Sequence, residues 1–451
     1  MTHLSCLEWS EVPVHNGKAG VPSGHFSRDQ ANSILSAAKA HPLSGKDGSQ
    51  IIEDRHSCLR TKQMVGVIAA EGCSLEILPK IDGNGPAAIR HHLVSMLDLV
   101  LKLNIGTGNS ANLGTQRESL LEIVIRHFAD ALLSEVRRGL PRRYLAHEDD
   151  LPQLRGRLNI GRQFTQLAVR LDKVASRFDA LSHDIPLLQI MKATVNFVLH
   201  HSRNPKTTRR LDELRFLLAE VSDIPVSALP WNAIHINRTN YRWQSLLEIS
   251  RLFLKRDWQN TKAERDGLGG LSLLFPMNDL FEEYVEALLG KAARRLPFDI
   301  KSQGGRKFCL FEESAEPGPF FQTKPDFMLL QEGKVVSLID AKWKRLVPKT
   351  RDKKQQISQA DVYQMMAYSR LYDCPDLVLL YPHHIRLGNA PFERVFRLNG
   401  GQGHDRLSVV TLDIAQPPNA VLNALADLLE RRLPARAQHL LQSPPSGGSL
   451  D

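Results

Sequence analysis

Apolar residues in the last third of the chain alternate between strand-like runs and helical spacing. Short β-branched or leucine-rich runs predict strands, and apolar residues three or four positions apart predict helices. The pattern predicts a helix from Asn278, a strand at 307–311 and a hairpin of strands 326–330 and 335–339. It then predicts a helix at 358–372, strands at 377–381, 394–398 and 407–413, and a helix at 420–432. This order predicts an α/β fold with helices on both faces of a sheet.

The preceding residues divide into a β-rich part and a helical part. Residues 63–70 and 74–80 predict a hairpin around Glu71-Gly72, and Asp29 is expected to cap a helix over 30–39. Helical spacing then recurs at 86–103, 116–138, 187–199, 211–221 and 235–258. One strand is expected among these helices, over 144–164. The glycine-rich segment 106–115 is interpreted as a linker rather than a phosphate loop, because no strand precedes it and no lysine follows.

These patterns predict a division of the chain into three folded regions and a tail. We expect a small β-rich domain over residues 1–85 and a mainly helical middle region over 86–265. An α/β domain over 266–435 follows, and the Pro-, Ser- and Gly-rich residues 436–451 predict a flexible tail.

Three charged residues stand at the ends of the predicted hairpin strands, where apolar residues are expected. Asp326 opens the first strand, and Asp340 and Lys342 close the second. Side chains two positions apart in a strand project from the same face, so Asp340 and Lys342 point together while Ala341 points away. Asp326 can join them from the neighbouring strand. The sequence therefore predicts two carboxylates and one ammonium group at one end of a sheet.

This cluster has ligands for a hard divalent cation. The carboxylates of Asp326 and Asp340, with the backbone carbonyl of Ala341, suit Mg2+, which prefers octahedral oxygen coordination and keeps several waters. The metal would polarise a phosphoryl oxygen, and Lys342 could hold or help deprotonate the attacking water and offset charge on the phosphate. We interpret the cluster as a metal-dependent phosphodiesterase centre. The competing interpretation is a turn residue at Asp326 and a solvated strand end at Asp340 and Lys342.

Two flanking helices supply further candidates. Glu282, in the helix that starts at Asn278, could add a third carboxylate, although Glu283 could serve instead. Gln364 and Tyr368 lie four positions apart on one helix face, which resembles the extra motif of RecB-like nucleases. A purely structural role is equally compatible with Tyr368, as part of a core face with Tyr363, Met366, Ala367 and Leu371.

Composition narrows the class of protein. The chain has 58 Lys and Arg against 49 Asp and Glu, a net charge of +9 that favours a polyanionic partner without requiring one. Its five cysteines are scattered without a Cys-x-x-Cys pair, so neither a disulfide framework nor a zinc site is indicated. The N-terminus lacks a signal-peptide pattern, and the apolar stretch 93–105 is too short to span a bilayer. We expect a cytoplasmic protein with no membrane association.

The chain also lacks the pattern of a nucleotide-binding loop. A P-loop needs Gly-Lys followed by Ser or Thr, so that backbone amides and the lysine surround the phosphates. Gly-Lys occurs at Gly17, Gly45, Gly290 and Gly333, and none of these pairs is followed by Ser or Thr. Any nucleotide hydrolysis is therefore expected to come from a partner.

The motif residues resemble a known nuclease family. Pro325-Asp326, thirteen intervening residues and Asp340-Ala341-Lys342 are similar to the PD-(D/E)xK signature of restriction-enzyme-like nucleases. With Glu282 and Gln364 in place, the chain resembles the McrC family, nuclease subunits of modification-dependent McrBC restriction systems. The resemblance extends in order over LEILPK at 75–80, LRGRLN at 154–159, FDALSHDIPLLQIMK at 178–192, NRTNYRW at 237–243, PMNDLFEEYV at 276–285 and DVYQMMAY at 361–368.

The resemblance implies both a reaction and a partner. It assigns the catalytic roles to Asp326, Asp340 and Lys342 in a PD-(D/E)xK domain, and it implies docking on a hexameric AAA+ GTPase of the McrB type. The expected function is a Mg2+-dependent endonuclease subunit that cleaves double-stranded, methylated DNA together with that GTPase. The alternatives are a catalytically silent adaptor that stimulates an AAA+ NTPase, and a stand-alone nuclease acting on RNA or branched DNA. Removal of residues 1–150 is expected to leave a folded domain with an intact metal site.

Overall fold

The computed structural model describes residues 2–17, 20–45, 49–83, 85–103, 118–170, 172–255, 271–294, 296–313, 318–347, 354, 357–398 and 405–432. The chain forms two compact units. The first unit combines Met1–Ala38, Ser44–Lys102 and Leu274–Asp451, and the second combines Lys39–Leu43 and Leu103–Leu273. The predicted linker at 106–115 and the predicted tail at 436–451 lie outside the described residues. Within the described ranges, no helix is long and apolar enough to cross a membrane.

A four-stranded sheet of the first unit contains strands from distant parts of the sequence. Its order is β1-β7-β6-β11, with bounds Thr2–Leu7, Cys73–Leu78, Met64–Ala70 and Leu271–Pro276. The antiparallel β6–β7 hairpin confirms the prediction, and Gly72 takes the positive φ of 69° that its tight turn needs. Since β11 ends where α8 begins, this sheet leads directly into the helix that carries Glu282.

A smaller sheet and two helices complete the N-terminal part of this unit. The sheet order is β3-β2-β5-β4, with bounds Phe26–Ser27, Glu11–His15, Cys58–Thr61 and Ile52–Asp54, and the helices are α1 (Arg28–Lys39) and α2 (Pro86–Leu101). The Ser27 hydroxyl accepts from the Gln30 N–H at 3.2 Å, and the Gln30 side-chain oxygen accepts from the Ser27 N–H at 3.0 Å. This reciprocal pair is a capping box. The prediction that Asp29 caps α1 is therefore wrong, because Asp29 lies within the helix.

The C-terminal part of the first unit is a six-stranded mixed sheet with the order β12-β15-β16-β17-β19-β18. Its strands in that order are Asp299–Ser302, Phe327–Gln331, Lys334–Ala341, Asp376–Pro382, Arg406–Leu412 and Glu393–Arg397. The helices are α8 (Met277–Ala293), α9 (Gln359–Tyr372) and α10 (Pro418–Glu430). A separate ribbon pairs β13 (Phe308–Phe311) with β14 (Pro319–Gln322). The predicted order of elements is confirmed here, with β12 and β14 as additions.

The central strands of this sheet are parallel and buried, as is typical of a sheet covered on both faces. The two central pairings, β16–β17 and β17–β19, are parallel, and β17 is buried throughout its length. Continuous apolar runs are typical of strands covered on both faces. On the side of α9, Tyr368 and Tyr372 pack into a core with Leu338, Leu377 and Leu379.

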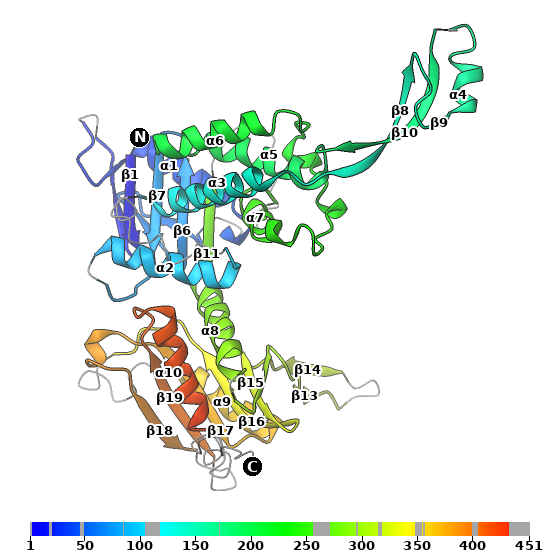
Figure 1. The fold of residues 1–451 in the computed structure, drawn as a ribbon. Helices are drawn as coiled ribbons and strands as arrows, with labels where there is room; N and C mark the ends of the chain where they lie inside the picture. The colour runs from blue at the N-terminus through cyan, green and yellow to red at the C-terminus, as the bar shows by residue number, and fades with distance from the viewer. Residues whose placement is uncertain are drawn as a thin grey trace, which may run out of the picture. The chain divides into compact units, whose positions relative to one another are not determined.

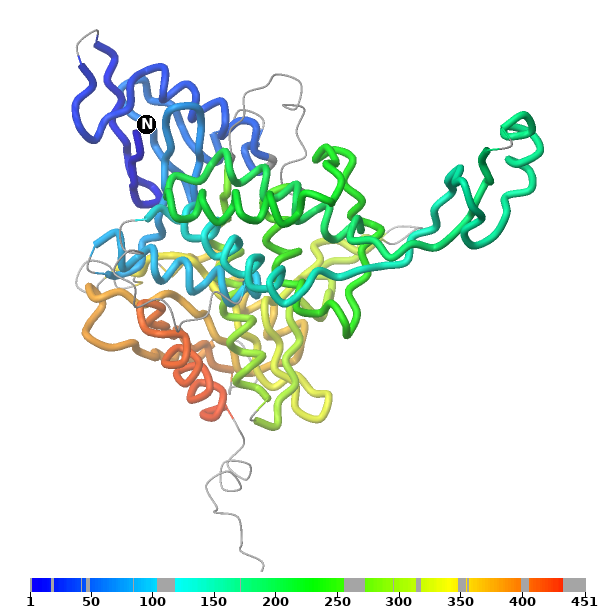
Figure 2. The backbone as a smooth tube through the Cα atoms, turned by 45° about the horizontal axis from the view of Figure 1, so that its top comes forward, coloured from blue at the N-terminus to red at the C-terminus, as the bar shows by residue number. Residues whose placement is uncertain are grey.

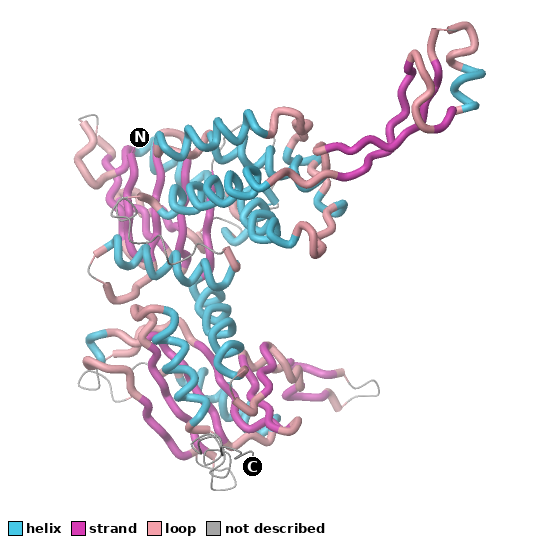
Figure 3. The backbone as a smooth tube through the Cα atoms, viewed as in Figure 1, coloured by secondary structure: helices cyan, strands magenta, loops and turns pink. Residues whose placement is uncertain are grey.

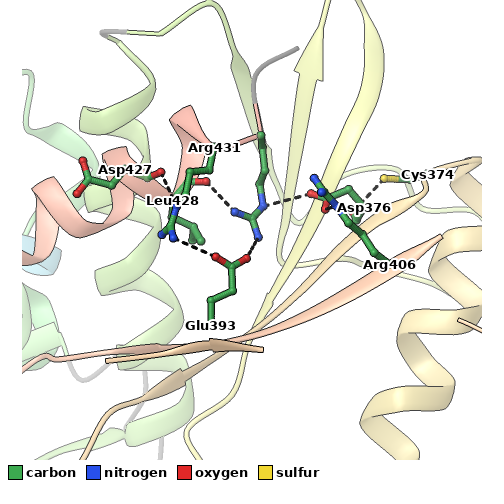
Figure 4. Close-up of polar contacts among 8 residues, drawn as sticks. Cys374, Asp376, Glu393, Arg406, Asp427, Leu428 and Arg431 are labelled. Carbon is green, nitrogen blue, oxygen red and sulfur yellow. Dashed lines mark hydrogen bonds and ion pairs between the residues drawn. The ribbon is translucent and has the colours of Figure 1, made fainter. Parts of the chain in front are cut away.

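Buried ion pairs tie the end of α10 to two strands of this sheet (Figure 4). Arg432, whose side chain is 4% exposed, lies 3.2 Å from Asp376 and 3.0 Å from Glu393. Arg406 pairs with Asp376 at 2.6 Å, and Arg431 pairs with Glu393 at 3.2 Å. Each carboxylate thus has two guanidinium partners, which compensates for its removal from water.

The second unit is mainly helical, as Figure 3 shows. Its helices are α3 (Leu120–Arg138), α5 (Pro186–Leu199), α6 (Pro205–Leu217) and α7 (Gln244–Ser250), the last continued by a π-helical turn over Arg251–Lys255. A three-stranded sheet, β8-β10-β9, interrupts them at Arg143–Leu151, Val174–Ser182 and Arg157–Leu158, together with α4 at Ile160–Thr165. The long β8–β10 ribbon extends away from α3 and α5 of the same unit (Figures 1 and 2). We refer to residues 143–182 as the arm.

Three element predictions in this unit are wrong in part. The helix expected over 211–221 lies at Pro205–Leu217, with Asn204 as its N-cap, and the other two differ because side chains compete with regular backbone pairing. The expected helix over 235–258 begins only at Gln244, since the Asn237 side chain accepts the Thr239 N–H at 2.9 Å and holds a turn. The expected strand over 144–164 ends before α4, whose first turn is capped by Asn159 through the Arg162 N–H at 3.2 Å.

Candidate active site

The register of two neighbouring strands brings the predicted site residues together. β15 and β16 run antiparallel with Phe327 opposite Ile339, so Asp326, just before β15, lies beside the end of β16. Asp340 and Ala341 are the last residues of β16. The Lys342 N–H then donates to the Leu380 carbonyl at 2.8 Å, which holds the chain against β17 for one further residue.

One contact holds Asp326 against the backbone of β16, and another joins the Lys342 and Asp340 side chains. The Asp326 Oδ2 accepts the Ala341 N–H at 2.8 Å. The Lys342 Nζ lies 2.7 Å from the Asp340 Oδ2, with Asp340 1% and Lys342 21% exposed. Asp340 is therefore a buried group rather than part of a solvated strand end. Burying a carboxylate is costly unless a positive charge or hydrogen bonds compensate it.

The two carboxylates perturb each other strongly. Burial, together with the charges of Asp340 and Glu282, raises the pKa of Asp326 to about 8. Burial also raises the pKa of Asp340, and the charge of Lys342 opposes that rise. Burial alone would lower the pKa of Lys342, but the charge of Asp340 and its hydrogen bond outweigh that effect, so this pKa is raised. In the absence of a cation, the site therefore favours protonated over ionised carboxyl groups.

The structure distinguishes Glu282 from Glu283. Glu282 is half-buried on α8, and burial together with the charges of Asp279 and Asp340 raises its pKa to about 7, against the effect of Lys342. The Glu283 side chain is largely exposed. Its pKa is also raised, by partial burial and by the charges of Asp279 and Glu286, but not by any charge of the cluster. Only Glu282 therefore senses the charges of the cluster.

The predicted pair on α9 is formed. The Gln364 side-chain amide donates to the Tyr368 hydroxyl at 2.7 Å. Tyr368 is buried, and burial, together with the charges of Asp340 and Asp326, raises its pKa against the effect of the Gln364 hydrogen bond. Tyr368 therefore belongs to the core and also faces the acidic cluster. The wider core face proposed around it forms only in part: Leu371 packs against the same core, whereas Tyr363 and Met366 are exposed.

The sequence interpretation did not include a second lysine–carboxylate pair beside the site. The Lys344 Nζ lies 2.9 and 2.8 Å from the two carboxylate oxygens of Asp361, at the start of α9. The Tyr381 hydroxyl also donates to Asp361, at 3.4 Å. The charge of Asp361 contributes to the raised pKa of Asp340. In the sequence, Lys344 stands two positions after Lys342, which could have indicated a second lysine on the same side. Nothing in the sequence indicated that Asp361 would be its partner.

The residues present fit an oxygen-coordinated cation. Within the described residues, the Asp340 Oδ1 is buried without a hydrogen-bond partner, and a divalent ion would stabilise the ionised carboxylates that burial disfavours. No group of three or more His, Cys, Asp or Glu side chains in the described ranges forms a closed ligand set. The donors that fit are Asp326, Asp340 and the Ala341 carbonyl, with water completing the coordination. Glu282 is then an outer carboxylate.

Comparisons with known proteins agree on one family. A family model described as McrBC 5-methylcytosine restriction system component matches residues 59–382. No curated protein matches the chain. A solved half-complex from the tetradecameric assembly of Thermococcus gammatolerans McrB AAA+ hexamers with bound McrC is similar at 21% identity and a TM-score of 0.72, covering 96% of this chain and 100% of the matched chain.

A second solved structure, the cryo-EM structure of the Thermococcus gammatolerans McrBC complex, is similar at 22% identity and a TM-score of 0.52. The match covers 64% of this chain and 88% of that chain. At these identities the likeness concerns the fold, whereas the family model spans most of the sequence and includes Glu282, Asp326, Asp340, Lys342 and Gln364. The chain therefore belongs to the McrBC 5-methylcytosine restriction system component family, which confirms the resemblance to McrC drawn from its motifs.

Proposed function

We propose that this protein is the Mg2+-dependent DNA endonuclease subunit of a modification-dependent restriction system and that its C-terminal sheet is a PD-(D/E)xK nuclease core. One observation carries the proposal: the buried carboxylate of Asp340, the partly buried carboxylate of Asp326 and a lysine meet at the ends of the adjacent strands β15 and β16, with Lys342 2.7 Å from Asp340. Two repelling carboxylates, one of them buried, are unfavourable for stability alone. It is useful where a divalent cation and a phosphate have to be held.

In this proposal, a magnesium ion held by Asp326, Asp340 and the Ala341 carbonyl supplies Lewis-acid polarisation of the phosphate and a bound water. Asp326 also orients the backbone of β16, because it accepts the Ala341 N–H at 2.8 Å. Glu282 is placed to receive a proton near neutral pH, since its pKa of about 7 lies close to the pH of the cell.

Lys342 acts as a cation rather than as a base. A lysine that accepts a proton must be neutral first, whereas the neighbouring carboxylates raise the pKa of Lys342 and keep it charged. A charged ammonium group donates hydrogen bonds to the attacking water and to a phosphate oxygen. It also stabilises negative charge that develops on the phosphate during cleavage.

The partner in this proposal is an AAA+ GTPase of the McrB type. The fold is similar to that of a chain from an assembly of McrB AAA+ hexamers with bound McrC, over 96% of this chain. The arm presents exposed apolar side chains, an unusual number for a surface facing only water: Tyr144, Leu154, Leu158, Ile160, Phe164, Val169 and Leu181. We assign the arm to the surface that contacts this partner, and methylated double-stranded DNA to the substrate.

A catalytically silent adaptor would have no use for this carboxylate pair, and the pair therefore disfavours that alternative. A stand-alone nuclease on RNA or branched DNA would share the same site but would not need the partner. These alternatives differ in what the purified chain does alone and with the GTPase.

The test is a cleavage assay with methylated duplex DNA, Mg2+, GTP and the GTPase partner. Asp340→Asn and Lys342→Ala should each lose at least about 100-fold in rate, because each removes a group that binds the metal or the phosphate charge. Both variants should still stimulate the partner's GTPase. Full cleavage by both variants would refute the site, and GTP-independent cleavage by the chain alone would favour a stand-alone nuclease.

A further inference from the structure

The residue after Lys342 is held by the N-terminal sheet of the same unit. The Trp343 indole N–H donates to the Glu8 Oε1 at 2.9 Å, although the two residues are 335 positions apart in sequence. The same Glu8 oxygen accepts the Lys80 N–H at 3.0 Å. Glu8 is 1% exposed and follows β1, and Lys80 follows β7. Trp343 is itself buried, so this hydrogen bond is shielded from water.

A second residue of the N-terminal part, Gln63, contacts two segments of the site. Its side-chain amide donates to the Trp343 carbonyl at 3.2 Å and to the Asn278 Oδ1 at 2.9 Å. Its backbone carbonyl accepts the Met277 N–H at 3.2 Å. Gln63 therefore joins the start of α8, which carries Glu282, to the segment that carries Lys342.

Two further contacts complete this arrangement. The Trp343 ring lies 5.4 Å from the ring of Phe281, measured between centroids, and Phe281 precedes Glu282. Arg345 pairs with Asp82 at 3.0 Å, and Asp82 also accepts the Ile385 N–H. The residues on both sides of Lys342 are thus fixed, by β16 before it and by the N-terminal part after it.

We infer that Glu8 and Gln63 are positioning residues of the nuclease site, which act through Trp343 to aim Lys342 at Asp340. This inference rests on the proposed function of the site. The Lys344 N–H donates to the Lys342 carbonyl at 2.9 Å and closes a tight turn centred on Trp343, so a fixed Trp343 also fixes the backbone from which the Lys342 side chain leaves. Holding a lysine side chain in one geometry costs substantial rotamer entropy, and a fixed backbone on both sides of Lys342 reduces the number of geometries available to it.

The chemistry of Glu8 supports a hydrogen-bonding role rather than a charge role. Its Oε2 is buried without a hydrogen-bond partner in the described part of the chain, and both contacts use Oε1 as an acceptor. A glutamine carbonyl can accept the same two hydrogen bonds, whereas a leucine cannot. An unsatisfied indole N–H in a buried site carries a desolvation penalty, so loss of the acceptor favours movement of Trp343.

The experiment measures kcat and KM for DNA cleavage by the full-length chain with its GTPase partner, in Glu8→Leu, Glu8→Gln and Trp343→Phe. Glu8→Leu and Trp343→Phe should lower kcat about tenfold with KM and GTPase stimulation unchanged, because 1.4 kcal/mol of lost positioning corresponds to tenfold in rate. Glu8→Gln should restore kcat to within about twofold of wild type.

Thr194→Val is the control. It removes a fully buried hydroxyl that donates to the Ile190 carbonyl at 2.8 Å within α5 of the second unit, and no described contact joins it to Trp343. It should lower the melting temperature and leave kcat unchanged. The inference is overturned if Glu8→Leu matches Thr194→Val in kcat, or if Glu8→Gln is as impaired as Glu8→Leu.

Asp340→Asn separates this inference from the proposed function. If the wild type cleaves and Asp340→Asn does not, the site stands and the Glu8 series decides the inference. If Asp340→Asn cleaves normally, the proposed site fails and the positioning role fails with it.

Discussion

The carboxylate pair predicts that Asp340→Asn stabilises the metal-free protein. The perturbation replaces a carboxylate by a neutral amide of nearly the same shape, next to Asp326. The pKa of Asp326 lies at about 8, against its ordinary value of 3.8, so the folded protein holds a proton there that the unfolded chain has released. Stability then falls as pH rises between these two values, because the folded state binds more protons over that window.

The size of the effect follows from the causes of the raised pKa. Burial is the largest cause of the rise and the charge of Asp340 the second, so removal of that charge should contribute on the order of 2–3 kcal/mol, against about 6 kcal/mol for the whole rise at ~1.4 kcal/mol for each pKa unit. Loss of the pair between Asp340 and Lys342 costs about 1 kcal/mol, since Lys342 remains partly exposed and keeps Asp326 nearby. We therefore expect a net gain of about 1–2 kcal/mol near pH 8 and a net loss of about 1 kcal/mol near pH 5, where only the loss of the Lys342 pair remains.

The assay is urea unfolding of the metal-free protein at both pH values, repeated with saturating Mg2+. Magnesium should stabilise the wild type by mass action and leave Asp340→Asn unchanged, because the variant lacks a ligand charge. Lys342→Met should have the opposite sign and destabilise the metal-free protein, since it leaves the carboxylates without their cation. An Asp340→Asn variant that is less stable than wild type near pH 8, or equally stabilised near pH 5, would refute the electrostatic reasoning.

Two further predictions follow from other contacts. Burial and nearby carboxylates raise the pKa of Glu282 to about 7, so its ionised form is lost as pH falls through that value and cleavage should decline there. Glu282→Gln should flatten this decline in the measured pH–rate profile and lower the rate at higher pH. Glu283→Gln is the control and should behave like wild type. Arg432→Met should cost about 3 kcal/mol in urea unfolding, because it leaves the buried Asp376 and the partly buried Glu393 with one partner fewer each. Arg431→Met, at a 59% exposed side chain, should cost under about 1 kcal/mol. Equal losses in the two arginine variants would contradict the burial argument.

Local sequence patterns were sufficient for the elements around the site. The hairpin that carries Asp326 and Asp340 and the helices that carry Glu282 and Gln364 follow from apolar spacing, which depends on neighbours a few residues apart. The helix expected from residue 235 failed because asparagine side chains can replace backbone hydrogen bonds, an outcome that apolar spacing does not register.

Contacts between distant segments could not be predicted in the same way. Nothing near Glu8 in the sequence indicates an indole 335 residues away, and nothing near Lys344 indicates Asp361 as its partner. These contacts also change one expectation. Removal of residues 1–150 would take away Glu8, Gln63 and three strands of the sheet that β11 completes, so the remaining chain should not keep an intact site. The three-region division of the chain itself stays a prediction.

The place of β11 in the N-terminal sheet has a consequence for the order of folding. β11 completes a sheet whose other strands end at Leu78, and the second unit is synthesised between them. At about 10 residues per second, a ribosome needs roughly half a minute to pass from Glu8 to Trp343, which are 335 positions apart. Until β11 has been made, the apolar strand β6 has an unpaired edge, a feature that favours aggregation. A chain that ends before β11 carries this exposed edge, and a chain that ends before β16 still lacks the nuclease site, so cleavage competence arises only after most of the protein has been made.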